Sequence, residues 1–237
     1  MIAVDWRPHR LADCLVLTPR GELDATTVWA VRDDLVAYAL ERPRAIIVVV
    51  DDLVIGSSAA LGAFSSAWQR TATWPAVPIS LVAGDQDRHA ALTGSPVADS
   101  VPVHASLDAA MAKLGDAPPR RRAGLELAPV GSSSHRAREF VRATCERWDL
   151  SDRAPQAVMV ATELVENSIS HAATDFRLEL EPRDGGLVVA VRDGSPRPAT
   201  LLADGRPGGL RVVEHLATEW GCASDSVGGK VVWAVLA

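Results

Sequence analysis

Apolar positions in the first half of the chain alternate between strand-like runs and helical spacing. Residues 15–17 and 45–50 are short apolar runs, and the second is so continuous that both its faces should be buried in a sheet. Between them, residues 25–41 place four apolar side chains on one helical face, namely Val28, Val31, Leu35 and Tyr38. This strand, helix, strand order predicts a right-handed crossover in a layered α/β domain. The remaining elements that we expect there are a helix over 58–70, a strand over 79–83 and a helix over 107–114.

The second half places its helices before its strands. Helical spacing predicts two helices, over 134–148 and 154–172, and the alternation that follows predicts a strand over 176–181. The later elements that we expect are a strand over 187–191, a helix over 210–217 and a buried strand over 231–236. Between them, residues 193–209 form a long segment rich in glycine and proline, and such loops are uncommon unless they are functional.

The periodic pattern lapses near the middle of the chain, where two prolines and several like charges oppose regular structure. We therefore predict one domain over residues 1–114, a linker over 115–123 and a second domain over 124–237. A chain of 237 residues is long enough for each half to bury its own core.

Composition narrows the class of protein. The formal net charge of −6 argues against a nucleic-acid partner, and we interpret the compact basic run Arg120–Arg122 as part of a solvated linker. Cys14, Cys145 and Cys222 are odd in number and widely spaced, which disfavours a disulfide framework and a zinc site. There is no run of about 18 apolar residues and no signal-like amino terminus, so we expect a cytoplasmic protein without a membrane partner.

One helix carries a candidate site. In the predicted helix over 154–172, Glu163, Asn167 and His171 follow each other at i, i+4 spacing and form a polar stripe. An apolar set on another side of the helix would pack on the core, namely Val158, Ala161, Val165 and Ile169. Carboxamide and carboxylate oxygens suit Mg²⁺, and a nearby carboxylate can act as a base. The same spacing also fits an ordinary solvated helix face.

The order of the later motifs resembles the GHKL ATPase superfamily, and in particular its bacterial anti-sigma-factor serine kinases. Residues 163–171 resemble its N box, 191–196 its adenine-binding motif, 208–210 its glycine turn and 228–233 its closing motif. The resemblance implies an α/β sandwich, the Bergerat ATP-binding fold, that binds ATP and Mg²⁺. It gives Glu163 as the catalytic base and Asn167 as the metal ligand, and the cofactor-binding residues as Asn167, His171, Asp193, Ser195, Gly208, Gly209, Leu210 and Lys230.

The first half resembles the STAS domain of anti-sigma-factor antagonists. Residues 21–27 resemble the start of that domain, and residues 57–61 align with the signature that carries its regulatory phosphoserine. The alignment makes Ser58 the candidate phosphoacceptor, with Ser57 beside it at the start of the predicted helix. The alternative is that one of these two serines is only a helix cap.

Together these resemblances imply a STAS-like α/β domain fused to a GHKL-type domain in a bacterial partner-switching system. The implied partners are a sigma factor or a STAS or anti-sigma protein, and homodimerisation stays open. The alternative is a non-catalytic docking regulator, which the departures Ser195, Val231, Ser57 and Ala60 favour. An independent ATPase or histidine-kinase module is less favoured, because the first half offers no long dimerising helix with a phosphoacceptor histidine.

Overall fold

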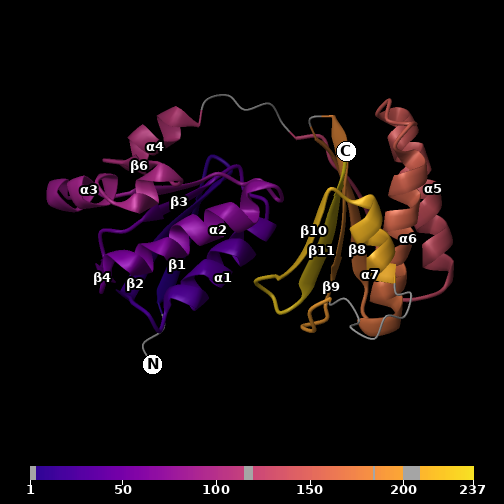
Figure 1. Ribbon diagram of the computed structural model, residues 1–237, viewed down its shortest axis with the longest axis horizontal. Helices are drawn as coiled ribbons and strands as arrows, with labels where there is room; N and C mark the ends of the chain where they lie inside the picture. Colours follow the sequence, from indigo (N-terminus) through magenta and orange to yellow (C-terminus); the bar gives the residue numbers. More distant parts are fainter. Residues whose placement is uncertain (1–3, 115–119, 184, 200–208) are drawn as a thin grey trace. The chain divides into compact units, whose positions relative to one another are not determined.

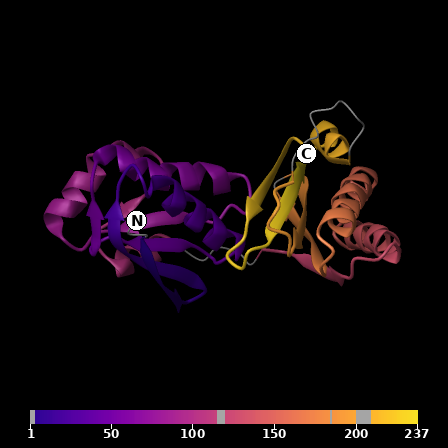
Figure 2. The same ribbon diagram turned by 90° about the horizontal axis from the view of Figure 1, so that it is seen from below.

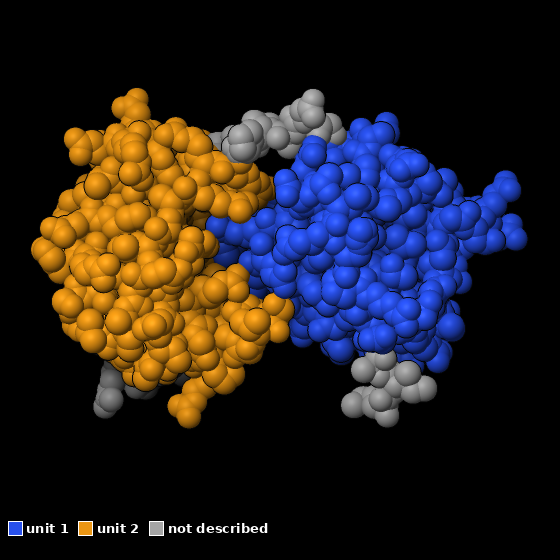
Figure 3. Space-filling view, turned by 180° about the vertical axis from the view of Figure 1, so that it is seen from behind, with its two compact units in different colours: residues 1–118 blue, residues 119–237 orange. Residues whose placement is uncertain are grey.

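The computed structural model describes residues 4–114, 120–183, 185–199 and 209–237. The chain divides into two compact units, residues 1–118 and 119–237 (Figure 3). The boundary falls inside the segment predicted as a linker, of which residues 115–119 lie outside the described residues. The other end of that segment is structured, because strand β7 begins at Ala123. Within the described residues, no helix is long and apolar enough to cross a membrane.

The first unit is built on a mixed sheet with parallel strands at its centre. Its main path is β1-β2-β3-β5-β6, and β4 pairs separately with β2. The parallel strands are β2 (Cys14–Leu23), β3 (Ile46–Val49), β4 (Leu53–Ile55), β5 (Ile79–Val82) and β6 (Val103–His104). Strand β1 (Asp5–Leu11) runs antiparallel to β2. The parallel pairing of β2 with β3 confirms the predicted strand, helix, strand unit.

Helices lie on both faces of this sheet. Helices α1 (Val28–Leu40) and α2 (Gly62–Ala72) pack side by side (Figure 1). Helix α4 (Leu107–Lys113) packs against the sheet through Ala110, on the face formed by Val16, Ile47 and Val82. Because side chains alternate along a strand, their buried neighbours Leu15, Ile46 and Leu81 face the opposite side. The remaining elements are α3 (Gln86–Thr93) and two short 3₁₀ helices, η1 (Ser58–Leu61) and η2 (Pro96–Asp99).

The second unit is a two-layer α/β sandwich. Its antiparallel sheet has the order β10-β11-β9-β8-β7. The strands are β7 (Ala123–Leu127), β8 (Phe176–Arg183), β9 (Gly186–Asp193), β10 (Glu219–Ser224) and β11 (Lys230–Leu236). Three helices cover one face of the sheet (Figures 1 and 2), namely α5 (Ser132–Arg147), α6 (Ala154–His171) and α7 (Gly209–Leu216). The core lies between these layers.

The basic run Arg120–Arg122 is exposed and lies outside helices and strands, as expected, but it also contacts the second unit. The guanidinium groups of Arg120 and Arg122 each lie 3.5 Å from the carboxylate of Glu181, which is buried on β8. The guanidinium of Arg121 stacks over the ring of Trp148, 5.5 Å from its centre. The run therefore belongs to the second unit, where it neutralises a buried carboxylate and covers an aromatic ring.

Candidate functional site

Helix α6 positions the predicted polar stripe. Its buried face is formed by Ala157, Val160, Ala161, Leu164, Val165 and Ser168. Two members of the predicted apolar set, Val158 and Ile169, are only partly buried at the edge of this face. Glu163 and Asn167 are also partly buried, whereas His171 is exposed at the carboxyl end of the helix. The helix thus keeps the carboxylate and the carboxamide beside its buried face.

The environment of Glu163 favours its protonated form. Burial raises the pKa of this carboxyl above its usual value, and the negative charge of Glu166 raises it further. Both causes disfavour the ionised side chain. A carboxylate whose pKa is raised in this way is a stronger proton acceptor, which is the property that a general base needs.

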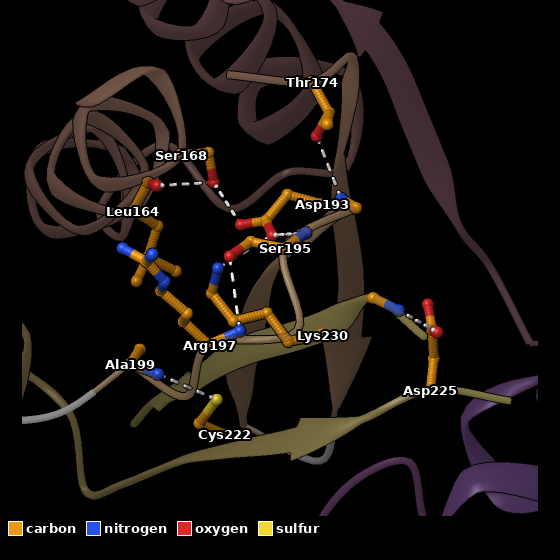
Figure 4. A network of polar contacts seen from close by, with 12 residues as sticks. Leu164, Ser168, Thr174, Asp193, Ser195, Arg197, Ala199, Cys222, Asp225 and Lys230 are labelled. Carbon is orange, nitrogen blue, oxygen red and sulfur yellow. Dashed lines mark hydrogen bonds and ion pairs between the residues drawn. The ribbon is translucent and has the colours of Figure 1, made fainter. Parts of the chain in front are cut away.

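The carboxylate of Asp193, at the end of β9, is the centre of a buried hydrogen-bond network (Figure 4). The ammonium of Lys230 lies 2.7 Å from its Oδ1, and the backbone N–H of Ser195 donates to the same oxygen at 2.9 Å. The hydroxyl of Ser168 lies 2.9 Å from Oδ2 and 3.3 Å from the carbonyl oxygen of Leu164. Its single proton goes to the shorter contact, because a hydrogen bond to a charged acceptor is the stronger of the two.

Sheet register explains why Lys230 reaches Asp193. Strand β11 begins where its antiparallel neighbour β9 ends, so Lys230 and Asp193 are direct partners. Both side chains continue the face of the sheet on which Val191 and Val232 are buried in the core. The strands come so close that a Cβ on Gly229 would lie 2.3 Å from the carbonyl oxygen of Asp193. Glycine at this position therefore permits the approach.

The hydrogen bonds nearly saturate the Asp193 carboxylate. An ionised carboxylate offers about four acceptor positions, and the three donors named above occupy three of them. One position remains on Oδ2. The side chains of Asp193 and Lys230 are only 1% and 4% exposed, so the carboxylate is shielded from solvent in this arrangement.

The structure describes some of the other predicted site residues but not all of them. Gly208 lies outside the described residues, and Gly209 begins α7. Leu210 is partly buried against the core, and α7 packs on α6. Among the described residues the carboxamide of Asn167 makes no hydrogen bond, so it is uncommitted. Across the same residues no group of three or more His, Cys, Asp or Glu side chains is placed to hold a metal ion, so Mg²⁺ at Asn167 would need oxygens from phosphate and water.

In the first unit, the two candidate serines have different environments. Ser57 caps η1, because its hydroxyl accepts a hydrogen bond of 3.4 Å from the N–H of Ala60. Ser58 is the first residue of η1; it is exposed, and its hydroxyl has no partner within the described residues. The cap interpretation therefore holds for Ser57. The chain just before them lies close to the end of β2, since a Cβ on Gly56 would be 2.9 Å from the Glu22 carboxylate.

Comparison with known proteins finds solved structures that are similar to part of this chain. No family model and no curated protein matches the sequence. Among solved structures, an anti-sigma factor antagonist from Mycobacterium paratuberculosis is 20% identical, with a TM-score of 0.39, over 48% of this chain and 95% of that chain. SpoIIAA, an anti-sigma factor antagonist in its unphosphorylated form, is 14% identical, with a TM-score of 0.37, over 48% of this chain and 100% of that chain.

A third similar structure is that of the protein TM1081, solved by NMR. It is 16% identical, with a TM-score of 0.39, over 46% of this chain and 88% of that chain. Each of these three similarities therefore covers about half of the chain. The GHKL resemblance of residues 124–237 stays a prediction.

Proposed function

We propose that this chain is a partner-switching regulator whose second unit binds ATP with Mg²⁺ and phosphorylates a serine of an antagonist-like domain. The observation that carries the proposal is the hydrogen bond from Ser168 to Asp193. Ser168 directly follows Asn167 on α6, so this bond brings the predicted metal ligand and the predicted base-binding aspartate to the same end of the sandwich. These residues are 26 positions apart in sequence.

Within the described residues, the carboxamide that would hold Mg²⁺ at the phosphates is free, whereas the carboxylate that would bind the base already has hydrogen-bond partners. At the phosphate end, Asn167 has an uncommitted carboxamide oxygen for Mg²⁺, which would offset phosphate charge. The backbone N–H groups at the start of α7, which begins at Gly209, favour anions. At the base end, the Asp193 carboxylate could accept from an exocyclic amine, but three donors share it and its side chain is only 1% exposed in this arrangement.

The proposed reaction transfers the terminal phosphoryl group to a serine hydroxyl. The bond between serine Oγ and phosphorus forms, the bond to the bridging oxygen of ADP breaks, and the hydroxyl proton goes to Glu163. The raised pKa of Glu163 suits it to accept that proton. Ser58 is the acceptor that we favour within this chain, because it is exposed and its neighbour Ser57 is committed as a cap.

Two measurements test this proposal. Calorimetric titration with ATP and Mg²⁺ should give saturable binding that Asn167→Ala loses. Phosphate incorporation from labelled ATP should be abolished by Glu163→Ala and by Ser58→Ala but retained in Ser57→Ala. Incorporation that survives Ser58→Ala would rule out that acceptor while leaving the kinase in place. Absence of ATP binding in a folded protein would contradict the proposed nucleotide site.

A second candidate function is a docking regulator without catalysis. The specific observation that favours it is the buried pair between Asp193 and Lys230, which closes the base end of the site. In that case the folded chain would bind its sigma-factor or anti-sigma partner equally well with and without ATP. Glu163→Ala and Asn167→Ala would then leave partner binding unchanged.

A further inference from the structure

Lys230 occupies a position at Asp193 that a ligand amine could take. An exocyclic amine of a purine would donate an N–H to the carboxylate, and the Lys230 ammonium already donates one to Oδ1 at 2.7 Å (Figure 4). The ammonium also carries a full positive charge, so its bond is stronger than one from a neutral amine. The chain therefore contains its own competitor for the base end of the site.

Packing alone does not account for a lysine at this position. Strand β11 is otherwise an apolar run, and its inward face is buried in the core at Val232, Ala234 and Leu236. Replacing a buried ion pair by well-packed apolar side chains is often neutral or stabilising, so this pair is weak evidence of a purely structural role. Among the described residues, Asp193 is the hydrogen-bond partner of the ammonium, which has three protons to donate.

The position of Lys230 also allows it to leave. It is the first residue of β11 and follows Gly228 and Gly229, the first of which has a φ of +87°. Its stem of four carbons can turn toward solvent while the later ladder of β11 with β9 stays paired. After it leaves, Asp193 keeps the hydrogen bonds from Ser168 and Ser195 and regains the acceptor position on Oδ1.

We infer that Lys230 is an internal plug of the nucleotide-base position, and that binding of an aminopurine nucleotide requires its displacement from Asp193. This inference rests on the proposed function, because it concerns the regulation of the same site. The affinity that is measured is then the intrinsic affinity reduced by the fraction of molecules in which Lys230 has moved away. Any partner that holds Lys230 outward would raise nucleotide affinity.

The first experiment titrates the full chain and two Lys230 variants with ATP and Mg²⁺. Lys230→Met removes the competing donor, and we expect its dissociation constant to fall by roughly tenfold or more. Lys230→Gln keeps an uncharged donor and should give a smaller gain. Purine riboside 5′-triphosphate, which lacks the exocyclic amine, should gain less than ATP from either change. Lys113→Met is the control, because Lys113 is exposed in the first unit and is the only other lysine of the chain.

The second experiment needs no substitution. Because the chain has two lysines, acylation of each can be followed separately by mass spectrometry of its peptides. Lys230 should react far more slowly than Lys113 in the free protein, since its side chain is only 4% exposed. Addition of ATP and Mg²⁺ should increase the modification of Lys230 and leave that of Lys113 unchanged. A conventional ligand contact would instead protect Lys230.

The outcomes separate the inference from the proposed function. If the parent chain binds ATP but the Lys230 variants bind no tighter and acylation does not rise, the plug is refuted while the nucleotide site stands. If neither the parent nor folded Lys230→Met binds ATP, both the nucleotide site and the plug are refuted. Tighter binding in Lys230→Met, together with acylation exposed by nucleotide in the parent, supports the plug.

Discussion

Removing Lys230 should destabilise the second unit mainly by leaving Asp193 as a buried carboxylate without its charged partner. The two side chains are 1% and 4% exposed, and their charged atoms are 2.7 Å apart. Breaking a buried pair by removing one partner costs about 3–5 kcal/mol, whereas replacing both partners by apolar groups is often neutral. We therefore expect Lys230→Met to cost about 3–5 kcal/mol, and Asp193→Ala to cost less, because the freed ammonium can turn toward solvent. The double variant should cost far less than the sum of the two.

The assay should report on the second unit alone. Because the chain has two compact units, a single unfolding free energy for the whole chain is not well defined. Hydrogen exchange of the amides in β9 and β11 reports the local free energy of opening where the pair lies. The three variants complete a double-mutant cycle with the parent, and the cycle isolates the interaction between the two residues.

The ion pair of Arg20 with Asp52 is the matched control. Its charged atoms are 2.9 Å apart, but each side chain is 48% exposed. Asp52→Ala should therefore cost less than about 1 kcal/mol, measured by exchange in β2. The reasoning about burial fails if Lys230→Met is equally mild, or if the costs of the two single variants simply add in the double variant.

Three further predictions concern local structure. Gly229→Ala should destabilise the start of β11 by about 1–3 kcal/mol, because the new Cβ would meet the carbonyl oxygen of Asp193. Faster hydrogen exchange of the first amides of β11 would show this loss. Glu163→Gln should stabilise the second unit at neutral pH. The pKa of Glu163 is raised in the folded protein, so the ionised parent loses stability as pH rises above about 4.5, and hydrogen exchange of the α6 amides should become equal in the two proteins below that pH. Ser57→Ala should lower the stability of the first unit by about 0.5–1 kcal/mol, while Ser58→Ala changes its urea midpoint little because that hydroxyl is exposed.

The elements with strong periodicity were predictable from the sequence. The helical spacing over 154–172 gave α6 to within a residue at its end, and the apolar run at 45–50 gave β3. The missed strands lack that signal. Strand β1 has six exposed positions out of seven, so its sequence lacks the alternation of apolar and polar residues that a buried face produces. Strand β4 has three residues and depends for its existence on its pairing with β2.

The places of the candidate residues on a helix and a strand were predictable from the sequence, but the hydrogen-bond network around them was not. Sequence spacing placed Glu163 and Asn167 on one stripe of a helix, and Asp193 at the end of a strand. It could not give the pairing of Asp193 with Lys230, because that contact depends on the register between strands 37 residues apart in sequence. The signal was a lysine at the start of an apolar run, which indicates a buried cation only once its neighbouring strand is known.

Under the function that we propose, the two ends of the site suit a nucleotide site that is regulated. An ionised carboxylate whose pKa is raised by burial costs folding free energy. Glu163 is such a group, and Asn167 makes no hydrogen bond within the described residues. Such features are typical of sites where stability is exchanged for function. If these residues bind a nucleotide as we propose, a carboxamide that no described residue binds at the phosphate end, beside a base end closed by Lys230, suits a site whose occupancy depends on displacing one side chain.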